Sequence, residues 1–152
     1  MIFDTATAFL IEQSITELGV DAALCRGDKD GQWTLTYKGS TVYIDLFSFP
    51  EKPNQFYFQV MSPLMKVPDR NKEAIYLNLL TINFELYGCS ICVKGEWMYM
   101  MSLREADNLD KSEIDATIDR IAYYSADYYS KLLFKYEGCW DSKPTDTMPN
   151  NN

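Results

Sequence analysis

The chain has 152 residues, 47% of them hydrophobic, which is enough to bury one sizeable core but not two. Fourteen Lys and Arg residues stand against 22 Asp and Glu residues, and the net charge of −8 argues against nucleic acid and anionic membrane surfaces as partners. No apolar run reaches the roughly 20 residues that a membrane span requires, and the first residues lack the pattern of a secretory signal. We therefore expect a single domain that lies in the cytoplasm.

The first half of the chain predicts one helix followed by three strands. Apolar residues within 3–18 recur at spacings of three and four, which places them on one side of a helix that ends before a glycine. Apolar and polar residues then alternate over 33–37 and 42–46, a pattern that predicts a β-hairpin. A loop with two prolines at 47–54 interrupts the pattern, and residues 56–61 form a third strand.

The second half predicts a helix, a second hairpin and a long helix. Residues 69–87 are apolar around most of the helix circumference, so this helix should be buried on more than one side. Alternation returns at 89–93 and 97–103, on either side of a tight turn. Asp110 and Glu113 then form a capping box at the start of an amphipathic helix.

The predicted order is α-β-β-β-α-β-β-α, which indicates an α+β fold with an antiparallel sheet packed with helices. We assign residues 1–138 to this domain. Residues 139–152 contain two prolines and three asparagines but few apolar side chains apart from Trp140 and Met148. Their composition predicts a disordered polar tail.

Several residues within this order resemble a known family. They are the Leu and Asn spacings of Tyr76–Asn83, Gly88, the Lys94–Gly95 turn and the helix start at Leu109–Asp110. Together with the element order, they resemble the YbjN family, which is described as sensory transduction regulators and whose fold is similar to the type III secretion chaperones.

This resemblance is strongest over residues 70–137 and rests on element order alone over residues 3–66. It implies an antiparallel sheet packed with helices, a tendency to form homodimers and the binding of segments of another polypeptide. It carries over no catalytic residue and no cofactor, and it does not identify the partner.

The residues that usually carry catalysis or bind metals are scarce. The chain has no histidine, which removes the most frequent general base and metal ligand. Cys89 and Cys92 form a CxxC pair, but residues three apart on a strand point to opposite faces, and a zinc ion would also need Cys25 and Cys139. We therefore predict no catalytic, cofactor or metal site. The alternative function is a small-ligand or metal-binding sensor that uses the apolar sheet face or Cys89 and Cys92.

The strand alternation separates a core face of the sheet from a second face that mixes polar, aromatic and methionine side chains. The core face is expected to hold Leu35, Val42, Ile44, Leu46, Phe56, Phe58, Val60, Ile91, Val93, Tyr99 and Met101. Methionine and tyrosine adapt to varied shapes, so the second face suits an apolar segment of another chain. The residues expected to bind this partner are Tyr43, Phe47, Tyr57, Met61, Met98 and Met100. The alternative is that the helix at 69–87 or a dimer partner covers this face.

The helix at 69–87 has more apolar surface than one sheet can cover, which predicts a homodimer through this helix. The expected interface residues are Tyr76, Leu77, Leu80 and Phe84.

Overall fold

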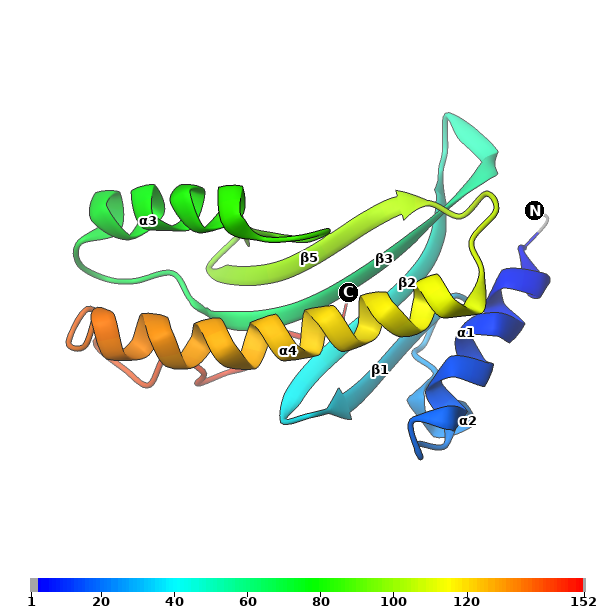
Figure 1. Ribbon diagram of the computed structural model, residues 1–152, viewed down its shortest axis with the longest axis horizontal. Coiled ribbons are helices and arrows are strands. Elements are labelled where there is room, and N and C mark those ends of the chain that lie inside the picture. Colours follow the sequence, from blue (N-terminus) through cyan, green and yellow to red (C-terminus); the bar gives the residue numbers. More distant parts are fainter. Residues whose placement is uncertain (1–2, 152) are drawn as a thin grey trace.

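The computed structural model describes residues 3–151, and its elements follow the predicted order with one short helix added (Figure 1). In chain order they are α1 (Thr5–Glu17), α2 (Ala22–Cys25), β1 (Gln32–Tyr37), β2 (Ser40–Phe49), β3 (Lys52–Lys66), α3 (Lys72–Glu85), β4 (Ser90–Lys94), β5 (Trp97–Glu105) and α4 (Lys111–Lys135). The predicted α+β class is therefore confirmed. No helix within residues 3–151 combines the length and the apolar character needed to span a membrane.

The strands form one antiparallel sheet in the order β1-β2-β3-β5-β4. The longest strand, β3, is central and pairs with β2 on one side and β5 on the other. It begins at Lys52, one residue before the second proline of the stretch that the sequence predicted to be a loop. Pro53 is tolerated there because it lies in an irregular stretch between the paired residues Lys52 and Phe56, where no ladder needs its missing N–H.

One face of this sheet is covered by helices. The longest, α4, runs along the sheet against β2, β3 and β5, while α1 packs on α4 and α3 packs on β4 (Figure 1). Their apolar sides meet the sheet in one core. Its fully buried side chains include Ile11, Ile15, Ile44, Leu46, Phe58, Leu64, Met65, Ile75, Met98, Met100, Ile114 and Ile118.

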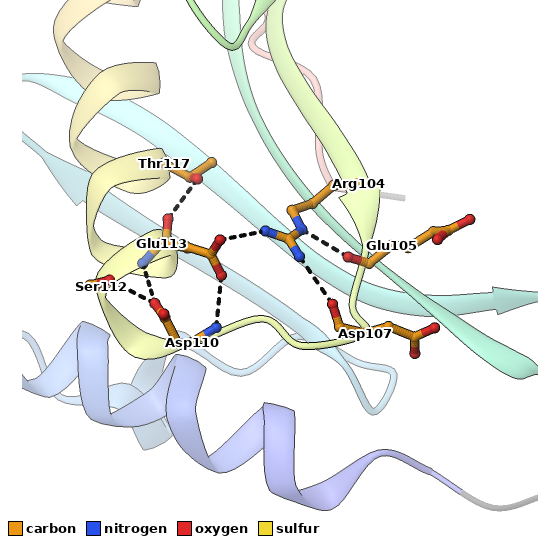
Figure 2. Close-up of polar contacts among 7 residues, drawn as sticks. All are labelled: Arg104, Glu105, Asp107, Asp110, Ser112, Glu113 and Thr117. Carbon is orange, nitrogen blue, oxygen red and sulfur yellow. Dashed lines mark hydrogen bonds and ion pairs between the residues drawn. The ribbon is translucent and has the colours of Figure 1, made fainter.

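A polar network fixes the start of α4 to the end of β5 (Figure 2). The Asp110 carboxylate accepts the Glu113 N–H at 2.9 Å, and the Glu113 carboxylate accepts the Asp110 N–H at 2.9 Å, so the predicted capping box is confirmed. Arg104 of β5 forms an ion pair with Glu113 at 3.0 Å and donates to the Asp107 carbonyl at 3.1 Å. The strand end and the helix start are thereby held together.

Residues 139–151 differ from the disordered tail that their composition predicted. They turn back from the end of α4 and pack against the sheet (Figure 1). Cys139 and Pro144 are buried, and the Trp140 indole N–H donates to the Lys66 carbonyl at 2.8 Å. A few contacts, made by Cys139, Trp140 and Pro144, thus hold in place a segment whose composition is mostly polar.

Candidate functional site

The candidate site is the face of the sheet opposite the helices, called the outer face below. Directly paired residues of an antiparallel sheet point to the same side, so the register identifies its members. Tyr43 pairs with Met61, Met61 with Met101, and Cys92 with Tyr99. Tyr43, Met61, Trp97 and Tyr99 form a second buried cluster, separate from the core beneath the helices, with Cys92 and Met101 packed against it.

Aromatic rings extend this apolar surface toward the tip of the β2–β3 hairpin. The ring centroids of Phe47 and Tyr57 lie 5.8 Å apart, and those of Phe49 and Tyr57 lie 5.0 Å apart. Phe47 and Tyr57 are half-buried and Phe49 is exposed. Rings of this kind offer a large contact area that loses little conformational entropy when a partner binds.

A buried carboxylate lies beside the aromatic group. Asp45 is 8% exposed and pairs across the sheet with Gln32 on β1 and Gln59 on β3, so three polar side chains form one row. The Asn151 amide also donates to the Asp45 carboxylate, at 3.4 Å. Burial raises the pKa of Asp45, and side-chain hydrogen bonds from these amides oppose that shift. The outer face thus combines an apolar area with one acceptor that amide or hydroxyl donors can satisfy.

Four of the six predicted partner-binding residues lie on the outer face, namely Tyr43, Phe47, Tyr57 and Met61. Met98 and Met100 do not, because their side chains belong to the core beneath the helices and are 0% exposed. The predicted alternation of β5 is one residue out of register. Trp97, Tyr99 and Met101 occupy the outer face instead.

The turn between β4 and β5 could have given this register from the sequence. Gly95 and Glu96 form a two-residue turn, which places Lys94 opposite Trp97 and therefore Ile91 opposite Met100. Since Ile91 was assigned to the core, Met100 had to share its face. Apolarity alone could not decide, because both alternating sets of β5 are apolar.

The two CxxC thiols are half-buried, and the Cys92 Sγ lies 3.7 Å from the Met101 Sδ. Burial raises the pKa of both the Cys89 and the Cys92 thiol. A raised pKa keeps a thiol protonated, whereas redox reactions and metal binding use the thiolate. Within residues 3–151, no three His, Cys, Asp or Glu side chains gather closely enough to hold a metal ion.

The predicted dimer residues form a separate surface on α3, at one end of the molecule (Figure 1). Leu77, Leu80 and Phe84 are exposed, whereas Tyr76 is half-buried and packs against the core. The helix is thus apolar on the side that faces away from the rest of the chain.

Comparisons with known proteins agree with this fold. The model of the YbjN family, described as "Putative bacterial sensory transduction regulator", matches residues 7–134. A comparison with curated protein sequences gives no match. A chain in the crystal structure of the ExsC–ExsE complex is 12% identical, with a TM-score of 0.64 over 86% of this chain and 96% of that chain.

Two further solved structures share the fold. The Yersinia pestis type III secretion chaperone SycH, in complex with a stable fragment of YscM2, is 14% identical, with a TM-score of 0.54 over 78% of this chain and 96% of that chain. YbjN from E. coli is 12% identical, with a TM-score of 0.51 over 84% of this chain and 91% of that chain. The predicted resemblance to both groups is confirmed.

Proposed function

This chain belongs to the YbjN family, and from this premise we propose that it is a non-catalytic module that binds an extended segment of another polypeptide on the outer face of its sheet. The observation that carries the proposal is the buried apolar cluster of Tyr43, Met61, Trp97 and Tyr99, which lies on the face of the sheet opposite the helices described within residues 3–151. The proposal keeps two expectations from the sequence, a cytoplasmic location and a homodimer.

The composition of the outer face supports a polypeptide as the ligand. Aromatic and methionine side chains are enriched where proteins bind one another, and they adapt to several apolar shapes. The ExsC–ExsE and SycH–YscM2 structures provide further support, because chains of this fold were crystallised there with polypeptide partners. We extend this mode of binding to the present chain.

The test is partner capture by a tagged chain from a native lysate of the source cells, with quantification by mass spectrometry. A triple variant with Phe47→Ser, Tyr57→Ser and Met101→Ser removes the more accessible apolar side chains of the outer face. We expect this variant to capture at least about tenfold less polypeptide than the unchanged chain, because apolar anchor residues dominate binding energy.

The matched control changes three exposed apolar residues elsewhere, with Leu24→Ser, Tyr123→Ser and Phe134→Ser. It should capture as much polypeptide as the unchanged chain, and both variants should keep its melting temperature to within a few degrees. Equal capture by the outer-face variant would contradict the proposal. Unfolding or dissociation of that variant would show instead that the outer face is structural.

A further inference from the structure

The C-terminal segment has a firmly held first part, residues 139–145, called the root. The Cys139 carbonyl accepts the backbone N–H groups of Asp69 and Arg70, at 2.8 and 3.1 Å. Farther along, the Lys66 N–H donates to the Pro144 carbonyl at 2.8 Å. The root is therefore tied by backbone hydrogen bonds to the last residue of β3 and to the segment between β3 and α3.

The second part, residues 146–151, is called the strap and is held more weakly. The Tyr43 hydroxyl donates to the Pro149 carbonyl, and the Asn151 amide donates to the Asp45 carboxylate at 3.4 Å. Within the described chain, the strap makes no backbone hydrogen bond to a strand. Thr147 has a φ of +58°, an unfavourable conformation for a β-branched residue. Such a segment can detach without disturbing the sheet.

Both strap contacts end on side chains of the candidate site. Tyr43 belongs to the apolar cluster of the outer face, and Asp45 is the buried acceptor beside it. Tyr43 and Asp45 are two residues apart on β2, so the strap contacts the part of the site that lies on this strand. An incoming segment could not use these side chains while the strap is in place.

The chemistry of the strap indicates what such a segment must offer. Its first residue, Asp146, is charged, but the part that contacts Tyr43 and Asp45, from Thr147 to Asn151, carries no charge, although the whole chain has a net charge of −8. It supplies a main-chain carbonyl to the Tyr43 hydroxyl and a side-chain amide to Asp45. An extended, uncharged segment with an amide or hydroxyl side chain at the matching position could make the same contacts, whereas an acidic segment would be repelled by Asp45.

We propose that the strap is an internal competitor, which occupies the outer face in the free chain and leaves when an extended, uncharged polypeptide segment binds there. The competition rests on the proposed function of this face. A tethered segment acts at an effective concentration in the millimolar range, so even a weak strap can reduce the affinity for an outside segment by about tenfold.

Docking of the strap is tested with the full chain and with a chain that ends at Thr145 and keeps the root. Each isotope-labelled chain is titrated with a synthetic peptide that copies residues 146–151, and binding is followed by NMR. The peptide should shift the signals of Tyr43 and Asp45 in the shortened chain and bind the full chain about tenfold more weakly. Tyr43→Phe in the shortened chain should weaken binding, whereas Tyr123→Phe on α4 should not.

Equal binding to both chains, or no shift at millimolar peptide, would show that the strap does not occupy the outer face. Such a result would contradict the internal competitor and leave the proposed function intact. Competition is tested by partner capture, where the shortened chain should retain about tenfold more polypeptide than the full chain at limiting partner. If the peptide binds as expected but capture does not rise, the strap docks without competing, and the proposal is wrong. If neither chain captures any polypeptide, the proposed function fails and the competition fails with it.

Discussion

At the scale of single residues, Asp45 combines burial with charge. Burial raises the pKa of Asp45, while hydrogen bonds from Gln32, Asn151 and Gln59 and the charge of Lys94 act in the opposite direction. A raised pKa means that the folded chain binds this proton more tightly than the unfolded chain does. The resulting stability is fully present below the unfolded pKa and is lost as the pH rises through the folded pKa.

We therefore expect Asp45→Asn to raise the free energy of unfolding by about 1 kcal/mol near neutral pH, because the amide keeps hydrogen bonds without burying a charge. The gain should shrink as the pH falls, since the wild-type carboxyl then becomes protonated and neutral. Urea unfolding at several pH values between about 5 and 8 measures this. Asp107→Asn, at an exposed position, is the control and should change little. A loss of stability near neutral pH in Asp45→Asn would contradict the argument.

The residues of the candidate site could be predicted from the sequence only in part. On β2 and β3, polar residues such as Asp45 and Gln59 mark the outer face. The prediction placed Tyr43 and Met61 on this same face, in agreement with the strand register. On β5 the apolar residues of both faces look alike, so the pattern gave the wrong side for Met98 and Met100. Only the cross-strand register distinguishes the two faces there.

At the scale of elements, the prediction succeeded where local chemistry decides the structure. The start of α4 is an example, because the side chains of Asp110 and Glu113 accept each other's backbone N–H groups. This cap therefore needs no partner from a distant part of the chain. The short α2 was missed, since a helix of four residues leaves no periodic pattern. The early start of β3 was also missed, because the irregular pairing that tolerates Pro53 depends on the partner strand.

The capping box gives a prediction for α4. Asp110→Ala removes the acceptor for the Glu113 N–H, and we expect a loss of about 1 kcal/mol in the free energy of unfolding, typical of helix caps. Asp127→Ala, which breaks an exposed ion pair with Lys131 on the same helix, should cost less than about 0.5 kcal/mol. Chemical denaturation of both variants measures the difference. Equal losses would show that the cap adds nothing beyond a surface charge.

At the scale of the whole molecule, the sequence predicted the sheet and its helices but not the path of the C-terminal segment. Composition averages over a segment, whereas docking depends on a few contacts such as Trp140 with Lys66. Those contacts join residues far apart in the chain, and a local pattern does not contain them. The same limit applies to the partner, because its identity depends on the sequence of another polypeptide.

The exposed side of α3 leads to a prediction about assembly. Leu77, Leu80 and Phe84 are spaced by three and four residues and are 66%, 67% and 93% exposed, so they form one apolar stripe along the helix. Single chains rarely leave a contiguous apolar patch of this kind in water, and two copies can cover it by pairing the same stripe around a two-fold axis. Because α3 lies on the helix side of the sheet, such a dimer leaves both outer faces free.

We expect light scattering at high micromolar concentration to give about twice the chain mass of 17.6 kDa. The variant with Leu80→Glu and Phe84→Glu should be a folded monomer, because it would bury unpaired charges in the dimer but leaves them in water in the single chain. Phe134→Glu, at an equally exposed position on α4, should stay dimeric. The monomeric variant should still capture polypeptide, since the stripe and the outer face are separate surfaces. A wild-type mass of one chain would exclude the dimer, and a variant that stays dimeric would place the interface elsewhere.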